Sequence, residues 1–128
     1  MALMYLVDTN IFLEIFLDQE KSEVCKKFLN DNYSKLFISD FTLHSIGVIL
    51  YRYKKEELFK NFISDIFPLI KILNLPTSGY KIFLHSSSLP KLDFDDLYQY
   101  VIAKYFGLNI VTMDLDFKKV KDIKIKFL

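Results

Sequence analysis

The 128-residue chain has the length of one domain, and with 52% hydrophobic and 16% aromatic residues it has enough apolar side chains for a packed core. A formal charge of +1 excludes a protein that attracts nucleic acid over its whole surface, so any basic surface must be local. The single Cys25 excludes an intramolecular disulfide and a cysteine metal site, and the lack of a long apolar run or signal-peptide pattern leads us to expect a cytoplasmic protein with no membrane partner.

Short apolar runs alternate with longer helical patterns, which is typical of βαβ units and a parallel sheet. In chain order we expect a strand at Leu3–Val7, helices at Ile11–Leu17 and Ser22–Asn30, a strand at Lys35–Ile38, helices from Ser39 or Asp40 to about Lys54 and over Lys55–Phe67, and a strand at Ile70–Leu75. A helix over Thr77–Ser87, a loop at Ser86–Pro90, a helix over Phe94–Phe106 and strands at Asn109–Thr112 and Ile123–Phe127 follow. The pattern predicts one α/β domain over residues 1–128 with a central parallel sheet of four to five strands.

Polar residues and glycine mark the ends of the predicted helices. Thr9 and Asn10 are expected to cap the first helix, and Thr77 and Asp93 the last two helices. Gly107 follows the last helix and is expected to end it in the left-handed conformation. These signals place the helix starts close to the ends of predicted strands.

Three carboxylates stand where an apolar run ends or a helix begins. Asp8 follows the first strand, Asp96 lies in the first turn of the last helix, and Asp114 follows the strand Asn109–Thr112. In an open parallel sheet, ligands bind outside the carboxyl ends of the strands, where the strand order reverses. Acids gathered there repel one another unless a cation or a proton intervenes. The pattern therefore predicts a hard cation with oxygen ligands, used for phosphoryl chemistry.

These acids also have structural explanations. Asp8 could cap the first helix, and acids in the first turn of a helix stabilise its dipole, which accounts well for Asp93 and Asp95. Helical spacing sets Asp96 on the same side as Ala103, which suggests close contact with the sheet, and sets Asp95 on the same side as Gln99. We therefore expect Asp96 to face the crevice and Asp95 to face solvent.

Three segments resemble the PIN domain, a small α/β nuclease fold, and within it the toxins of VapC type. They are Leu6–Glu14, Asp95–Lys104 and Gly107–Phe117, and the similarity runs from about residue 4 to residue 128. The resemblance implies a three-layer α/β/α fold in which the central parallel sheet is flanked by helices. It also implies that Asp8, Asp96 and Asp114 are the catalytic acids and the metal ligands.

Further residues are expected to support the acids. Asn10 would orient Asp8 or bind a water molecule beside the metal. Thr112 matches the hydroxyl residue that usually accompanies the family's last acid, Asp114. Asp116 would support a turn or a second metal ion.

The chain departs from the family at one acid. The family usually has a Glu on the helix after the second strand, and this position aligns with Ser45. A hydroxyl can hold a metal-bound water molecule but adds no negative charge. Because Mg²⁺ keeps several water molecules and often takes one or two carboxylates, the three aspartates could still suffice. Glu14 and Asp40 are alternative sources of the missing carboxylate.

The resemblance implies a Mg²⁺- or Mn²⁺-dependent endoribonuclease that hydrolyses RNA phosphodiester bonds, the toxin of a toxin–antitoxin pair. It further implies a cognate antitoxin that blocks the acidic crevice, and a homodimer. The helices Ile11–Leu17 and Phe41–Lys54 could provide both contact surfaces. The alternative is a catalytically weak PIN-like domain that binds RNA or protein, which Ser45 favours. No Gly-rich phosphate loop supports a small-molecule phosphohydrolase.

Overall fold

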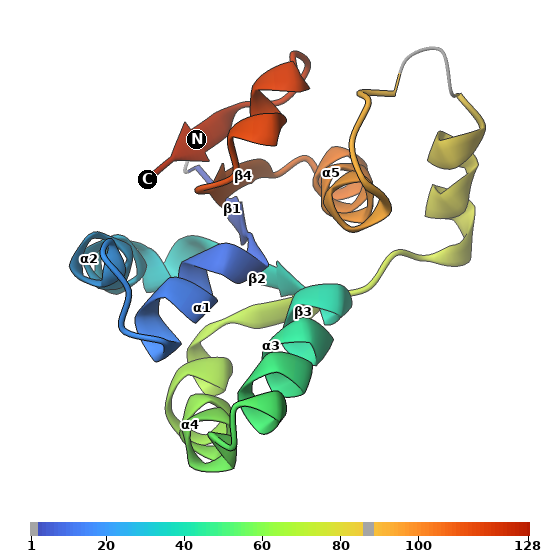
Figure 1. Cartoon of the computed structure of the whole chain (residues 1–128). Coiled ribbons are helices and arrows are strands. Elements are labelled where there is room, and N and C mark those ends of the chain that lie inside the picture. The colour runs from blue at the N-terminus through green and yellow to red at the C-terminus, as the bar shows by residue number, and fades with distance from the viewer. Residues whose placement is uncertain (1–2, 86–88) are drawn as a thin grey trace.

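Five parallel strands form the centre of the molecule in the computed structural model, which describes residues 3–85 and 89–128 (Figure 1). The sheet has the order β3-β2-β1-β4-β5, with β1 at Tyr5–Val7, β2 at Leu36–Ser39, β3 at Lys71–Leu73, β4 at Asn109–Thr112 and β5 at Ile125–Phe127. The chain moves from β1 to β2 on one side, whereas β4 pairs with β1 on the other side. The strand order therefore reverses at β1, and a ligand site is expected outside the carboxyl ends of β1 and β4.

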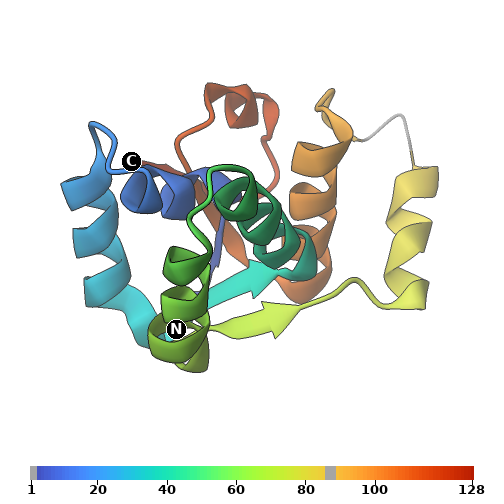
Figure 2. The same cartoon turned by 60° about the horizontal axis from the view of Figure 1, so that its bottom comes forward.

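Helices cover both faces of this sheet. One layer holds α1 (Thr9–Phe16), α2 (Ser22–Asn32), α3 (Asp40–Arg52) and α4 (Glu56–Asn61), and the other holds α5 (Phe94–Phe106). Shorter helical turns are η1 (Tyr33–Lys35), η2 (Phe62–Ile66), η3 (Phe67–Leu69), η4 (Thr77–Leu84) and η6 (Leu115–Lys119). Figures 1 and 2 both show η4 outermost, beside α5. The predicted three-layer α/β/α architecture is confirmed.

The strands are apolar on both faces because each face meets a helical layer. Successive side chains of a strand point to opposite faces of the sheet. Val7 and Val111 accordingly belong to the core under α1 to α4, whereas Leu6 and Ile110 belong to the core under α5. All four side chains are fully buried. This explains why β1 and the middle of β4 are apolar at successive positions, as expected for strands at the centre of a sheet.

The helix Phe94–Phe106 and the strand Asn109–Thr112 have the predicted bounds, and Gly107 has the predicted left-handed conformation with φ of 70°. The other predicted strands are shorter than expected or shifted by a residue or two. Residues 86–88 of the predicted loop Ser86–Pro90 lie outside the described part of the chain.

Two predicted helices are wrong in type. The segment expected as a helix over Lys55–Phe67 is α-helical at Glu56–Asn61 and continues as a π turn and a 3-10 turn, because Pro68 has no N–H with which to extend an α-helix. The segment after Thr77 is a 3-10 helix, with Pro76 rather than Thr77 in the capping position. Ser78 and Gly79 are weak α-helix formers, which favours the tighter turn.

Replacing Gly79 should test the close packing of η4. A Cβ atom at this position would lie 2.5 Å from Leu75 Cδ1 and 3.0 Å from Tyr105 Cδ2. Because Leu75 is 5% exposed and has little room to move, we expect Gly79→Ala to lower the free energy of unfolding by about 1–3 kcal/mol. Urea denaturation measures this change, with the exposed Thr77→Ala as control. Equal stability of the two variants would contradict the packing.

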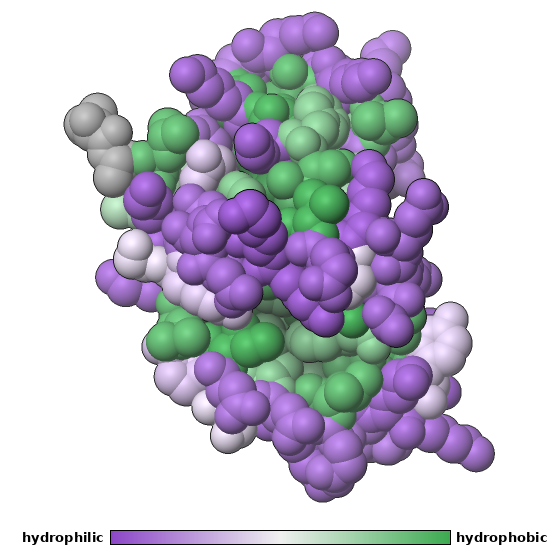
Figure 3. Space-filling model, turned by 90° about the vertical axis from the view of Figure 1, so that its left-hand side faces the viewer, coloured by the Kyte–Doolittle hydropathy of each residue, from purple (hydrophilic) through white to green (hydrophobic). Residues whose placement is uncertain are grey.

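The outer face of α2 is charged. Lys26 pairs with Glu23 and Lys27 with Asp31, at 3.3 Å and 3.0 Å. Figure 3, which views this side of the molecule, shows a hydrophilic belt between two hydrophobic areas. Exposed pairs of this kind add about 0.3–0.5 kcal/mol each, so α2 is held chiefly by its buried side, which includes the free thiol of Cys25. Within the described residues, the structure has no helix with the length and apolarity that crossing a membrane requires.

Candidate active site

The three aspartates singled out in the sequence lie together at the carboxyl edge of the sheet. Asp8 follows β1, Asp114 follows β4 after one residue, and Asp96 lies in the first turn of α5. They line one pocket of about 230 Å³, and Ser45 of α3 lines it as well. Segments that are far apart in the sequence therefore bring these side chains to one place, at the point where the strand order reverses.

Asp8 has two structural roles. Its side chain is 6% exposed, and it occupies the capping position of α1, where Oδ1 accepts a hydrogen bond of 2.8 Å from the Thr9 amide. The expectation that Thr9 and Asn10 cap this helix is therefore wrong, since both belong to its first turn. Asp8 occupies the capping position because it is the single residue between the end of β1 and the start of α1. Capping and lining the pocket are compatible, because the carboxylate has two oxygen atoms.

A chain of hydrogen bonds connects Asp8 with Asp114. The Thr112 hydroxyl oxygen accepts hydrogen bonds from the Asp114 amide at 2.9 Å and from Asn10 Nδ2 at 3.3 Å. Its single proton is donated to Asp8 Oδ2 at 2.7 Å. Asn10 also donates to Asp8 Oδ2 at 3.4 Å, and its Oδ1 accepts from the Met113 amide at 3.3 Å. Thr112 and Asn10 thus fix the two acids relative to each other.

A second buried network reaches Asp8 from α5, and the sequence did not predict it. Gln99 was expected on the solvent side of α5 together with Asp95, but its side chain is 1% exposed. Gln99 Nε2 donates to Asp8 Oδ1 at 3.2 Å and to Thr42 Oγ1 at 2.7 Å. The sequence feature that could have indicated this network is the amide side chain of Gln99 within the otherwise apolar run Leu97–Ala103. A polar residue surrounded by core positions must find buried partners.

Gln99 Oε1 has no hydrogen-bond partner among the described residues, although it is buried. Thr42, which is fully buried, holds the other end of this network, because its hydroxyl also lies 2.9 Å from Thr9 Oγ1 and 3.3 Å from Ser39 Oγ. An unpaired buried acceptor costs about 1–3 kcal/mol. Fixing Asp8 therefore has an energetic cost to the folded chain.

The closest grouping of carboxylates involves Asp96. Among the described residues, one ligand oxygen from each of Asp96, Asp114 and Asp116 lies within 4.8 Å of the other two. Burial and the negative charges of Asp8 and Asp114 raise the pKa of Asp96 to about 7. Burial likewise raises the pKa of Asp8, although hydrogen bonds from Thr112 and Gln99 oppose the shift. Such an arrangement suits a divalent cation, which removes the repulsion and prefers oxygen ligands.

The raised pKa of Asp96 predicts that the metal-free protein loses stability as the pH rises. Between its ordinary value of 3.8 and about 7, the native state binds more protons than the unfolded state, so the free energy of unfolding falls with pH and levels off above 7. Because Asp96 is half-buried, solvent screening limits this loss to about 1–2 kcal/mol. Urea denaturation with a chelator at pH 5 and pH 8 should show a smaller loss in Asp96→Asn than in the original chain. Equal losses would contradict the assignment.

The remaining candidates are placed as follows. Ser45, which was expected in the place of a Glu, is half-buried and lines the acid pocket. Glu14 does not line this pocket; its Oε2 accepts from the Lys21 amide at 2.8 Å. Asp40 is also outside, where its Oδ1 accepts from the Tyr98 hydroxyl at 2.8 Å. Neither Glu14 nor Asp40 supplies the missing carboxylate.

Comparisons with known proteins agree on the fold. A family model for the PIN domain matches residues 5–123. No curated protein sequence matches the chain. Its structure is similar to FitAcB from Neisseria gonorrhoeae (TM-score 0.79, 21% identity, 96% of each chain covered) and to a toxin–antitoxin complex from Klebsiella pneumoniae (TM-score 0.73, 21% identity, 93% of this chain and 94% of the other). It is also similar to VapC20 from Mycobacterium tuberculosis, a sarcin–ricin loop cleaving toxin (TM-score 0.72, 13% identity, 95% of this chain and 98% of the other).

Proposed function

The chain belongs to the PIN domain family, and on that basis we propose that it is a metal-dependent endoribonuclease, the toxin of a toxin–antitoxin pair. The observation that carries this proposal is the cluster of Asp96, Asp114 and Asp116 beside the buried Asp8, at the switch point of a parallel sheet. The carboxylates of this site can bind a cation. A phosphodiesterase needs such a positive charge next to its negatively charged substrate.

Some residues of the site would bind the metal ion, and others orient the Asp8 carboxylate. Asp8, Asp96 and Asp114 would hold Mg²⁺ or Mn²⁺, which would supply an activated water molecule and positive charge next to the phosphodiester. Asp8 is fixed by Thr112, Asn10 and Gln99, so its carboxylate needs little reorganisation during the reaction. The Ser45 hydroxyl faces the same pocket and can hold a water molecule there.

Cleavage of labelled single-stranded RNA tests the proposal. We expect products with Mg²⁺ or Mn²⁺ and none with a chelator. The catalytically weak domain remains the second candidate, because Ser45 lines the pocket without adding a charge. Binding of RNA without cleavage at any metal concentration would favour that candidate. The cleaved sequence is not encoded in contacts to phosphate, so several RNA sequences should be compared.

We further propose that an antitoxin segment binds the groove between α1 and α3. This groove encloses about 580 Å³ and is continuous with the acid pocket, because Asn10, Leu13 and Ile49 line both. Arg52 and Glu14 add one charge of each sign to its otherwise largely apolar wall. A peptide in this groove would reach the aspartates and exclude RNA.

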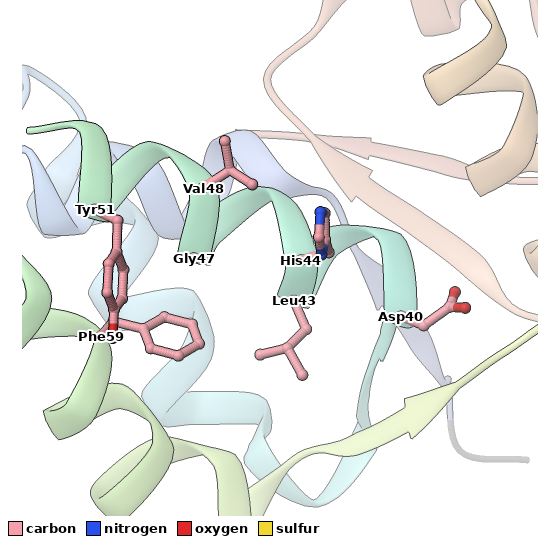
Figure 4. A pocket seen from close by; sticks show the side chains of 7 residues that line it. All are labelled: Asp40, Leu43, His44, Gly47, Val48, Tyr51 and Phe59. Carbon is pink, nitrogen blue, oxygen red and sulfur yellow. The ribbon is translucent and has the colours of Figure 1, made fainter.

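We propose that two copies of the chain form a homodimer through the side of α3 that faces away from this groove. Leu43, Val48 and Tyr51 line this side, and Figure 4 shows Leu43 and Tyr51 pointing from the same edge of α3, with Phe59 of α4 beside Tyr51. A hollow of about 680 Å³ forms where Gly47 has no side chain; a Cβ atom there would lie 3.3 Å from the Phe59 ring. Apolar surface of this kind is typical of a protein interface. Light scattering that gives the mass of a dimer would support the assignment.

A further inference from the structure

An aromatic pocket adjoins the acid pocket and has no role in the function proposed above. It encloses about 480 Å³, within the range of roughly 300–1,000 Å³ that is usual for small-molecule sites. Its lining comes from α3, η4 and α5: Asp40, Phe41, His44, Tyr80, Phe94 and Tyr98. Four of these six side chains are aromatic rings, so the pocket offers flat apolar surfaces.

The rings around this pocket form a row in which two pairs are stacked and the third is tilted. Tyr80 and Phe83 have centroids 5.8 Å apart with an interplanar angle of 27°, and Phe83 and Phe94 are 5.8 Å apart at 22°. Phe94 and Tyr98 follow at 6.4 Å and 34°. Phe94 is 67% exposed and Tyr80 is 49% exposed. Exposed parallel rings leave faces on which another flat ring can stack.

The row is fixed at its inner end and continuous with the acids. The Tyr98 hydroxyl accepts a hydrogen bond from the Leu75 amide at 3.3 Å and donates to Asp40 Oδ1 at 2.8 Å, so this ring is held in place. Phe41 lines both pockets, and Phe94 is separated from Asp96 by a single residue along α5. A chain of nucleotides bound at the acids therefore has the aromatic rings within reach of a neighbouring unit.

The charge of the protein favours stacking as the source of affinity for RNA. With a formal charge of +1, the chain has little excess positive charge with which to bind phosphates. Aromatic rings bind unpaired bases whatever their sequence, because every base has a π face.

We propose that the aromatic pocket binds an unpaired base of single-stranded RNA, stacked against Phe94, next to the phosphate that lies at the acids. The inference rests on the proposed nuclease function and specifies its substrate as an unpaired strand. A base held in this way fixes the position of the neighbouring phosphodiester bond relative to Asp96. Paired bases are not free to enter the pocket, so a duplex should be a poor substrate.

The test uses Phe94 variants and two RNA probes of equal length and charge. One probe is a labelled single-stranded oligouridylate, and the other is the same backbone without bases. With a chelator present to prevent cleavage, fluorescence anisotropy should show that Phe94→Ala and Phe94→Leu bind oligouridylate roughly 5- to 150-fold more weakly than the original chain. Phe94→Tyr should keep the original affinity within about twofold. Neither loss should appear with the probe that lacks bases.

Leu115→Ala is the matched control, because Leu115 is an apolar side chain, 62% exposed, outside the aromatic pocket. It should bind both probes as the original chain does. Equal weakening of both probes by Phe94→Ala would overturn the proposal, since a general distortion does not depend on the base. Unchanged binding of oligouridylate would overturn it as well and would leave the pocket to a protein partner.

The failure of this inference differs from the failure of the proposed function. If the original chain cleaves RNA with Mg²⁺ and Phe94→Ala has the same KM, the base pocket is wrong and the nuclease assignment stands. If the original chain does not cleave but discriminates between the probes through Phe94, the base pocket stands and the domain is a binding module.

Discussion

Replacement of Asp96 by Asn should reduce metal-dependent cleavage of RNA at least about a hundredfold. The substitution keeps the shape of the side chain and removes a charged oxygen ligand from the cluster with Asp114 and Asp116. Because burial and the negative charges of Asp8 and Asp114 raise the pKa of Asp96 to about 7, the variant should be at least as stable as the original chain at pH 8 without metal. A loss of activity then cannot be attributed to unfolding. Initial rates at saturating Mg²⁺ measure the effect.

Asp93→Asn is the control, since Asp93 is exposed and its side chain makes no capping hydrogen bond to α5. It should retain activity within about twofold. Asp8→Asn should also abolish cleavage but is a poorer test. The Asp8 carboxylate accepts hydrogen bonds from Thr112, Gln99 and the Thr9 amide, and an Asn amide group facing any of these donors would disturb the fold. Cleavage at the original rate by Asp96→Asn would exclude Asp96 as a metal ligand.

Replacement of Ser45 by Glu should increase the affinity for Mn²⁺ by about tenfold or more. Ser45 lines the pocket that contains Asp8, Asp96 and Asp114, so a longer acidic side chain there adds a fourth carboxylate near the cation. Without metal the same substitution should lower the free energy of unfolding by about 1 kcal/mol, because it adds a negative charge to an acidic cluster. The gain in affinity and the loss of stability have one physical cause and should appear together.

Calorimetric titration with Mn²⁺ and urea denaturation in a chelator measure the two effects. Ser45→Gln is the control, because it has the length of Glu without the charge, and its affinity for Mn²⁺ should remain close to that of the original chain. If Ser45→Glu and Ser45→Gln bind Mn²⁺ equally well, the side chain at this position does not reach the cation. A higher affinity with an unchanged cleavage rate would mean that the fourth carboxylate is not needed for turnover.

The elements predicted best are those whose sequence signals are local. The helix Phe94–Phe106 has an apolar stripe and ends at Gly107, and β4 has two β-branched apolar residues at its centre. The segment after Thr77 is a 3-10 helix, which the weak α-helix formers Ser78 and Gly79 favour, but the close packing around Gly79 by Leu75 and Tyr105 cannot be read from the local sequence. Tertiary contacts of this kind have no local signature.

The same difference between local signals and tertiary contacts applies to the candidate site. The approximate positions of Asp8, Asp96 and Asp114 follow from strand ends and helix starts, which the sequence marks. Of the partners that hold Asp8, Asn10 is two residues away in the sequence and was expected beside it, whereas Gln99 comes from another helix and could not be identified. Periodicity alone placed Gln99 on the solvent side, whereas helix α5 is in fact buried around most of its circumference from Tyr98 to Ala103. A helix packed on several sides has no reliable polar face.

The order of the sheet has a consequence for protein synthesis. β1 lies between β2 and β4, and the hydrogen bond from the Thr112 hydroxyl to the Asp8 carboxylate joins residues that are 104 positions apart. A growing chain that has not reached residue 112 lacks β4 and Asp114, and it leaves one edge of β1 unpaired. At roughly 5–20 residues per second, most of the chain is made several seconds before the acids can assemble. Translation itself therefore delays the nuclease proposed here until nearly the whole chain has been made.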